Sequence, residues 1–138
     1  MAHFFIFYTR LRTEEKLLFK AAEERGIPFS AVNASDGMWP DLPGDTGDVA
    51  LCRCVSQTQN SALAVLLESR GVLTINSSEV MGLCADKIVT AARLSAAGIP
   101  QPEYAVAFSP EGAAEGAKRL GYPLVIRPGF TLGGTGGG

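Results

Sequence analysis

Short apolar segments alternate with longer segments of helical periodicity along the first 75 residues, and this alternation constrains the fold most strongly. Phe4–Tyr8 is aromatic and β-branched and ends at a polar turn, which is typical of a buried strand. Similar segments occur at residues 28–33, 48–52 and 72–75, with helical patterns after the first and third strands. The order strand–helix–strand–strand–helix–strand predicts an α/β fold with an open, largely parallel sheet and right-handed crossovers.

The first helix is expected to begin at Thr13 and to end before Gly26. Thr13 has the side chain of a good N-cap, and Glu14 and Glu15 follow in the first turn, where the helix dipole favours acids. Gly26 suits the left-handed backbone that follows many helices. The spacing predicts an apolar face made of Leu17, Leu18, Ala21 and Ala22. The second helix is expected over residues 57–70.

A second unit is expected after the fourth strand. Asp86 has the side chain of an N-cap for a helix that runs to Ala97, and Pro100 and Pro102 form a stiff hinge. Beyond the hinge the sequence predicts a strand at 104–108, a helix at 110–120 and a strand at 124–127.

The end of the chain is a glycine run: five of the last six residues are glycine. Such a run is usually retained where backbone must approach a ligand closely, and structure then follows it. We therefore expect a truncated chain, and a flexible tail or an expression linker is the alternative. Residues 1–83 are predicted to form a Rossmann-like leading domain, and residues 84–138 an incomplete lobe.

The composition of the chain argues against several classes of function. The chain has 138 residues, and its 14 acidic and 12 basic residues leave a net charge of −2, which argues against broad binding to nucleic acid or to a membrane surface. The longest apolar stretch near the start, Phe4–Tyr8, is too short for a signal peptide or a membrane span. A soluble, cytoplasmic protein is expected.

Three cysteines, Cys52, Cys54 and Cys84, accompany a single histidine, His3. Zinc sites usually have four ligands at other spacings, so buried free thiols in a reducing compartment are the favoured interpretation. A metal site and a disulfide remain the alternatives.

Polar turns follow three of the predicted strands, and ligands of open α/β sheets bind at that edge. The turns contribute four candidate substrate-binding residues, Arg53, Ser56, Gln57 and Asn76, and the turn after the first strand adds Arg10 and Arg12. The planar fork of an arginine matches a carboxylate, so the edge is expected to bind a carboxylate-bearing substrate. The alternative is that surface loops are polar in any case.

Lys87 is predicted at the first position of a helix, where the helix dipole disfavours a cation. A nucleotide phosphate would compensate for this cost. A lysine that extends into solvent, or that pairs with Asp86 or Glu79, is the alternative.

Arg127 ends the last predicted strand, immediately before the glycine run. Backbone N–H groups of successive glycines can surround phosphate oxygens, and Arg127 adds a fixed charge. The segment is neither a Walker loop nor a dinucleotide-binding fingerprint. The predicted nucleotide-binding set comprises Lys87, Arg127, Gly133, Gly134, Thr135, Gly136, Gly137 and Gly138.

Taken together, several motifs resemble the ATP-grasp carboxylate ligases. They are Arg53-Cys54-Val55-Ser56-Gln57, Gly71-Val72-Leu73-Thr74-Ile75-Asn76, Asp86-Lys87, Ala97-Gly98-Ile99-Pro100-Gln101-Pro102 and Gly121-Tyr122-Pro123-Leu124-Val125-Ile126-Arg127-Pro128. The first three-quarters are most similar to the branch that includes the α-aminoadipate carrier-protein ligase and the ribosomal-protein glutamate ligase. The segment from Ile126 to Gly138 is more similar to the carbamoyl-phosphate synthetase large subunit.

This resemblance implies a pre-ATP-grasp domain followed by the start of an ATP-grasp lobe. It implies that ATP phosphorylates a carboxylate to an acylphosphate, from which an amine displaces phosphate, and that α-aminoadipate or glutamate is attached to a protein carboxylate. The Mg²⁺ ligands and catalytic residues are expected outside this chain, which should be inactive alone. A small acidic carrier protein or a ribosomal protein is the implied partner, and the full-length enzyme is expected to be a homo-oligomer that binds neither nucleic acid nor membrane.

Two alternatives remain open. One is a carbamoyl-phosphate-synthetase-like enzyme that phosphorylates bicarbonate or carbamate. The other is a non-catalytic α/β domain that binds a small molecule.

Overall fold

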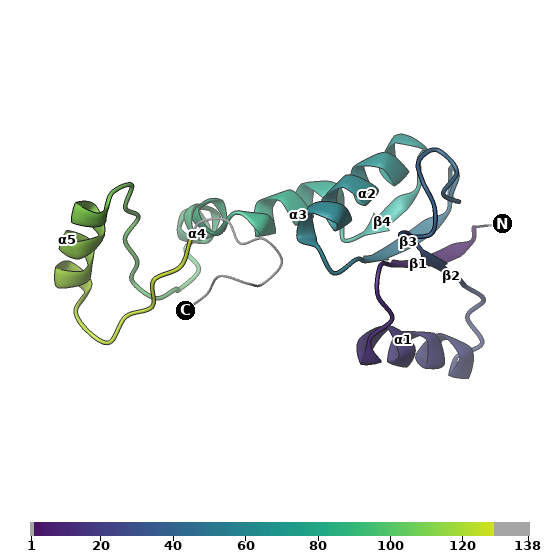
Figure 1. Ribbon diagram of the computed structural model, residues 1–138, viewed down its shortest axis with the longest axis horizontal. Coiled ribbons are helices and arrows are strands. Elements are labelled where there is room, and N and C mark those ends of the chain that lie inside the picture. The colour runs from purple at the N-terminus through teal and green to yellow at the C-terminus, as the bar shows by residue number, and fades with distance from the viewer. Residues whose placement is uncertain (1, 129–138) are drawn as a thin grey trace. The chain divides into compact units, whose positions relative to one another are not determined.

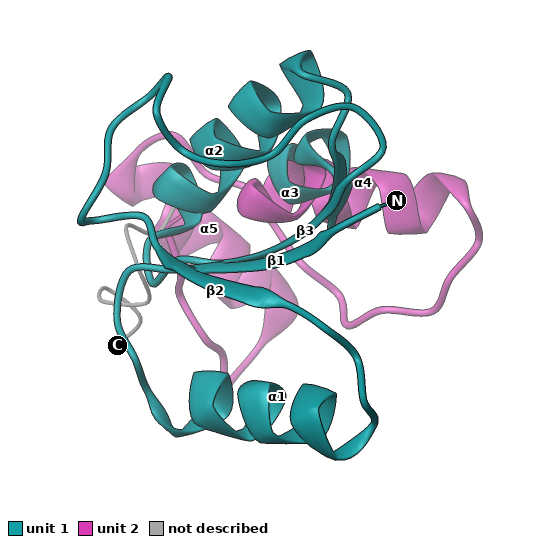
Figure 2. Cartoon of the chain, turned by 90° about the vertical axis from the view of Figure 1, so that its right-hand side faces the viewer, with its two compact units in different colours: residues 1–82 teal, residues 83–138 magenta. Residues whose placement is uncertain are grey.

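The computed structural model describes residues 2–128 (Figure 1). The chain divides into two compact units, Met1–Gly82 and Leu83–Gly138 (Figure 2). Each unit is described separately below.

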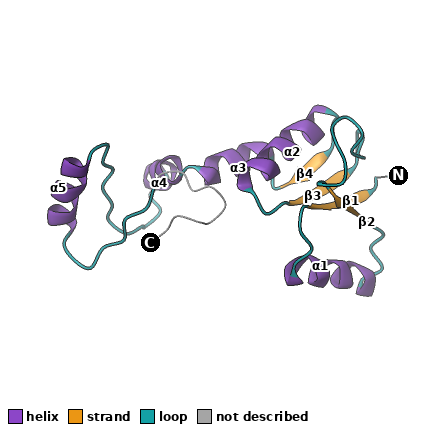
Figure 3. Ribbon diagram, viewed as in Figure 1, coloured by secondary structure: helices purple, strands orange, loops and turns teal. Residues whose placement is uncertain are grey.

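The first unit contains a four-stranded parallel sheet with the strand order β2-β1-β3-β4 (Figure 3). In the register of the sheet, Tyr8 at the end of β1 pairs with Asn33 of β2 and with Arg53 of β3. The predicted parallel sheet is therefore confirmed. The elements in chain order are β1 (Phe4–Tyr8), α1 (Thr13–Glu24), β2 (Ser30–Asn33), β3 (Val49–Arg53), α2 (Gln57–Ser69), β4 (Leu73–Ile75) and α3 (Ser78–Ala85). The last three residues of α3 lie beyond Gly82 and belong to the second unit.

The sheet is sandwiched between helices, with α1 on one face and α2 on the other (Figure 2). Alternate residues of a strand point to opposite faces, so Phe5 and Phe7 of β1 enter the core on the α2 side, while Ile6 is buried outside that cluster. On α1, Phe19 packs edge-to-face against Tyr8, with ring centroids 5.9 Å apart. The core cluster comprises Phe5, Phe7, Leu42, Ala50, Cys52, Cys54, Leu63, Ala64, Leu67, Val72 and Met81.

The start of α1 differs from the prediction in two ways. Arg12, not Thr13, is the N-cap, and its backbone N–H donates to the Glu15 carboxylate at 3.1 Å. Leu17, expected on the apolar face, is 61% exposed, whereas Glu15 and Ala22 are buried. Leu18, Ala21 and Ala22 of the predicted face are partly or fully buried. Glu15 also takes a buried position because two arginines neutralise its carboxylate.

The α3 helix was not predicted, and it begins directly after the turn that follows β4. The Ser77 hydroxyl accepts the backbone N–H of Val80 at 3.3 Å, which satisfies one of the unpaired donors at the start of a helix. The sequence pattern placed Ser78 in the polar turn after β4 and predicted no element over residues 79–85.

The second unit contains two helices within its described residues, α4 (Lys87–Ala96) and α5 (Pro110–Leu120). The predicted cap of α4 is confirmed, because the Asp86 carboxylate accepts the N–H groups of Ile88 at 2.8 Å and Val89 at 3.1 Å. The predicted helix at 110–120 is also confirmed, with Ser109 as its N-cap.

The two strands predicted in the second unit are wrong. Residues 104–108 and 124–127 form neither strand nor bridge. Their side chains remain accessible, with Phe108 96% and Val125 73% exposed. A strand needs a hydrogen-bonded neighbour as well as β-branched and aromatic residues, and the described part of this unit offers no such ladder.

None of the helices within residues 2–128 combines the length and the apolar character that crossing a membrane requires. Cys52 and Cys54 are free and buried, as expected, whereas Cys84 is free but exposed. Its side chain lies on α3, the helix that sequence reasoning missed.

Candidate functional site

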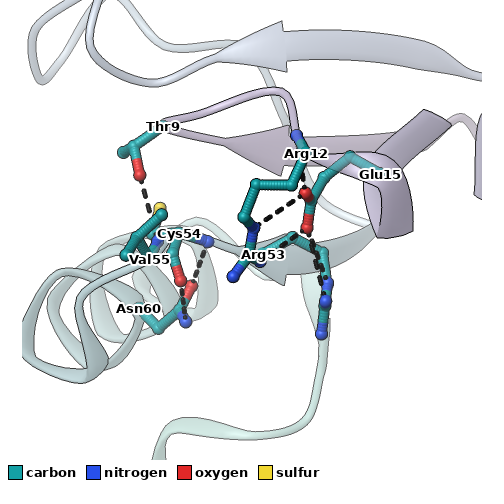
Figure 4. Close-up of polar contacts among 7 residues, drawn as sticks. All are labelled: Thr9, Arg12, Glu15, Arg53, Cys54, Val55 and Asn60. Atoms are coloured by element: carbon teal, nitrogen blue, oxygen red, sulfur yellow. Dashed lines mark hydrogen bonds and ion pairs between the residues drawn. The ribbon is translucent and has the colours of Figure 1, made fainter. Parts of the chain in front are cut away.

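The first candidate site lies at the carboxyl edge of the sheet, where β1 and β3 end side by side. The Thr9 hydroxyl accepts the backbone N–H of Val55 at 3.0 Å and so ties the two turns together. Asn60 of α2 holds Cys54 through both backbone groups: its Oδ1 accepts the N–H at 2.7 Å, and its Nδ2 donates to the carbonyl at 2.8 Å (Figure 4). The backbone next to Arg53 is therefore fixed.

Arg53 lies in a cluster with Arg12 and Glu15, called the Arg12–Glu15–Arg53 cluster below. Both guanidinium groups are directed at the Glu15 carboxylate (Figure 4). Arg12 donates from Nε to Oε2 at 3.0 Å and from Nη2 to Oε1 at 2.8 Å. Arg53 donates from Nε to Oε1 at 3.3 Å, and its Nη2 lies 3.3 Å from the same oxygen.

Glu15 is ionised in this cluster. Its side chain has no exposed surface, while each arginine side chain is 36% exposed. Hydrogen bonds from the Arg12 side chain lower the pKa of Glu15 to about 2, even though burial opposes the shift. One carboxylate and two guanidinium groups leave a net charge of +1 at the edge of the sheet.

The structure brings the other predicted substrate-binding residues to this edge as well. The Ser56 hydroxyl caps α2 by accepting the N–H of Gln59 at 3.3 Å, and the Gln57 side chain donates to the carbonyl of Met81 at 3.1 Å. Asn76 follows β4, the neighbour of β3 in the sheet. Ser56 and Gln57 thus each use one hydrogen-bonding atom within the fold, and the Arg53 side chain is 36% exposed.

Glu68 holds the turn that carries Asn76, and sequence reasoning missed it. Its carboxylate accepts the N–H of Ser78 at 2.8 Å and the hydroxyls of Thr74 and Ser78. Burial alone would raise the pKa of Glu68, but these hydrogen bonds outweigh burial and lower it. The only signal in the sequence is the pair of hydroxyl residues on either side of Asn76, which does not reveal a partner on α2.

The second candidate site is an open cleft of about 860 Å³ within the second unit. Its walls come from α4, from residues 104–109, from α5 and from residues 124–128. Lys87 and Arg127 are the charged side chains among the described lining residues, and most of the others are apolar. The two predicted basic residues therefore lie on the same cleft, although 40 positions separate them in the sequence.

The remaining predicted nucleotide ligands, Gly133, Gly134, Thr135, Gly136, Gly137 and Gly138, lie outside the described residues. An apolar cleft with two cations can accept a ligand that combines a flat apolar group with an anion. No group of three histidine, cysteine, aspartate or glutamate side chains within residues 2–128 could hold a metal ion.

Comparison with known proteins identifies the two parts of the chain. Residues 4–83 match the LysX preATP-grasp domain family. The chain belongs to this family. Residues 86–138 match a second family, the ATP-binding domain of the carbamoyl-phosphate synthase L chain. The resemblance of the leading part to one branch and of the tail to another is thereby confirmed.

Individual relatives agree with this assignment. The glutamate–LysW ligase ArgX of Sulfurisphaera tokodaii is 38% identical over 119 residues, which cover 86% of this chain and 42% of that protein. The α-aminoadipate–LysW ligase LysX of the same organism is 33% identical over 129 residues, or 89% of this chain and 45% of that protein. A solved structure, a RimK domain ATP-grasp protein from Sphaerobacter thermophilus, matches with a TM-score of 0.71 and 30% identity.

The matches cover most of this chain but only part of each relative. The solved structure covers 95% of this chain, but the chain covers only 52% of that structure. The chain thus spans about half the length of the two LysW ligases and of the solved structure named above.

Proposed function

We propose that this chain is the leading portion of an ATP-dependent carboxylate–amine ligase that attaches α-aminoadipate or glutamate to a protein carboxylate. The observation that carries the proposal is the placement of Lys87 and Arg127 on one apolar cleft, within the segment that matches an ATP-binding domain. Relatives named as glutamate–LysW and α-aminoadipate–LysW ligases support the choice of amino acid and of a carrier protein as the acceptor.

The cleft would bind ATP. Apolar side chains from α4, α5 and residues 104–108 would pack against the base, and Lys87 and Arg127 would neutralise the phosphates. The glycine segment with Gly133, Gly134, Thr135, Gly136, Gly137 and Gly138 would donate backbone N–H groups to the same phosphates.

The edge of the sheet would bind the carboxylate-bearing substrate. Arg53 would supply the charged contact, and Ser56, Gln57 and Asn76 would add polar contacts beside it. The fixed backbone around Cys54 favours this role because a binding group works best when it is held before the ligand arrives.

The proposed chemistry has two steps. A carboxylate oxygen attacks the γ-phosphorus of ATP, the bond to the bridging oxygen breaks, and ADP leaves. The amine of the amino acid then attacks the acyl carbon, phosphate departs with the bonding electrons, and the amine loses a proton. In such reactions Mg²⁺ would neutralise the transferring phosphoryl group, and its ligands are expected outside this chain.

The proposal also covers the partner, the oligomeric state and the cellular location of the protein. Its partner would be a small acidic carrier protein or a ribosomal protein, and no nucleic acid or membrane would take part. The full-length enzyme would be a cytoplasmic homo-oligomer in amino-acid biosynthesis.

The test is an assay of the full-length protein. ADP should form only when ATP, Mg²⁺, the amino acid and a carrier protein are all present, and mass spectrometry should show one amino-acid residue added to the carrier. Formation of ADP that depends on bicarbonate instead would favour the carbamoyl-phosphate-synthase-like alternative, which the match of residues 86–138 keeps open. Binding without any ADP formation would favour a non-catalytic domain.

A further inference from the structure

The Arg12–Glu15–Arg53 cluster contains more positive charge than its buried carboxylate requires. Arg12 alone forms a two-pronged ion pair with Glu15, through bonds of 3.0 and 2.8 Å, and this pair is already neutral. Arg53 adds a second guanidinium at 3.3 Å. A purely structural pair between α1 and the sheet would need only one of the two arginines.

The two arginines retain hydrogen-bonding capacity. Each turns its Nε and Nη2 toward Glu15, and among residues 2–128 neither Nη1 group has an acceptor. An arginine has five N–H donors in a planar fork, and each of these side chains is 36% exposed. Donors from both residues are therefore available to a ligand at the edge of the sheet.

The cluster is held in place by the turns around it. Arg53 precedes Cys54, whose backbone is fixed by Asn60, and the turn after β1 is tied to Val55 by Thr9 (Figure 4). Glu15 is fully buried and also accepts the backbone N–H of Arg12 at 3.1 Å. The carboxylate thus orients both guanidinium groups through their Nε and Nη2 atoms and leaves their Nη1 atoms for other partners.

We propose that Arg12 and Arg53 together bind a carboxylate group of the small amino-acid substrate, and that Glu15 is the positioning residue that orients them. The proposal rests on the ligase function proposed above. A bound carboxylate would bring the charge of the cluster from +1 to zero. A single small carboxylate is enough to balance the cluster, and the negative charge of Glu14 also acts on Arg12.

The main experiment measures binding, and a turnover assay of the same variants gives the KM values. Glutamate and α-aminoadipate are titrated calorimetrically into the full-length protein, with a non-hydrolysable ATP analogue present. Arg12→Ala and Arg53→Ala should each weaken binding about tenfold or more, because each removes a charge-assisted contact. The double variant should lose less than the sum of the two effects, since both residues contact one carboxylate. Arg25→Ala removes an equal charge at the far end of α1 and should change nothing.

Further variants separate positioning from folding. Arg12→Lys and Arg53→Lys keep the positive charge but lose the planar set of N–H donors. Each lysine variant should therefore bind the amino acid more tightly than the alanine variant but more weakly than the unaltered protein. Glu15→Gln keeps both arginines and should weaken amino-acid binding while the KM for ATP stays unchanged. If Glu15→Gln does not fold, the lysine variants still decide the question.

Three results would overturn the proposal: no binding of either amino acid to the unaltered protein, unchanged affinity in the double alanine variant, or an effect confined to the KM for the carrier protein. Failure of the ligase function looks different. In that case no ADP forms with any acceptor. The calorimetric affinities of the variants for the amino acids still show whether the Arg12–Glu15–Arg53 cluster binds a carboxylate.

Discussion

Glu15 shows how one residue can occupy a position that its polarity argues against. A buried carboxylate is costly unless it is paired and hydrogen-bonded, and Glu15 meets both conditions through Arg12 and Arg53. Sequence reasoning placed Glu15 correctly in the first turn but could not predict its burial. Glu15 lies on α1 and its partner Arg53 lies 38 positions away, at the end of β3, where it pairs with Tyr8 of β1; only the fold brings the two residues together.

The pKa of Glu15 makes stability depend on pH. The pKa is lowered from 4.5 to about 2 in the folded state, so the stabilisation is fully present above pH 4.5 and is lost as the pH falls toward 2. It amounts to on the order of 2 kcal/mol at neutral pH, after a discount for the partial exposure of both arginines. Urea denaturation from pH 7 to pH 2.5 should show the loss.

The matched variant for this prediction is Glu15→Gln. Asp48 and Glu68 also have lowered pKa values, so they contribute to the same pH dependence in both proteins. The difference in unfolding free energy between the two proteins should therefore shrink below pH 4. A difference that stays constant down to pH 2.5 would contradict the role of Glu15.

The three cysteines should differ in reactivity. Burial raises the pKa of Cys52 to about 12 and also raises that of Cys54, whereas Cys84 is exposed. The thiolate is the reactive form, so at pH 7.5 a maleimide should label Cys84 rapidly and the other two only after denaturation. Peptide mapping of the labelled native chain checks this, and early labelling of Cys52 would show that the sheet opens more readily than its packing indicates.

At the scale of elements, the connection from β4 to α3 depends on Glu68 of α2. Replacing Glu68 by Ala removes the acceptor of three hydrogen bonds, from Thr74 and from the N–H and hydroxyl of Ser78. We expect the free energy of unfolding to fall by roughly 1–3 kcal/mol, because partly buried donors lose their partner. Hydrogen exchange of the Ser78 amide should also accelerate.

Glu23→Ala is the control for this prediction, since it removes an exposed carboxylate from α1 and should leave both quantities unchanged. If Glu68→Ala accelerated exchange throughout the sheet as much as at Ser78, the effect would be global. The carboxylate would then not be a local anchor of the turn that carries Asn76.

The elements of the first unit were predictable from sequence because each signal was local and consistent. Apolar strands, helical periodicity and turn glycines agreed over residues 4–75, and the sheet followed from their order. The strands predicted at 104–108 and 124–127 failed for the opposite reason. Their composition suits a strand, but a strand depends on a neighbouring backbone, which no local pattern can supply.

At the scale of the whole chain, two segments with different relatives follow one another. Residues 4–83 belong with the LysX preATP-grasp domain, and residues 86–138 match an ATP-binding domain of another enzyme. Sequence reasoning anticipated both likenesses from motifs. It could not anticipate the partners of Ser56 and Gln57, because a hydroxyl or an amide that bonds within the fold looks the same in a sequence as one that binds a substrate.

The nucleotide proposal gives the most direct test of the second unit. Lys87 and Arg127 line one cleft, so Lys87→Ala and Arg127→Ala in the full-length protein should each weaken ATP binding about tenfold or more. If both side chains contact the same triphosphate, the effect of the double variant should be smaller than the sum of the single effects. Lys118→Ala, which removes an equal charge from the exposed side of α5, should leave the affinity unchanged. Calorimetry with Mg²⁺ present measures all four variants, and unchanged ATP affinity in both single variants would remove the main support for a nucleotide site in this cleft.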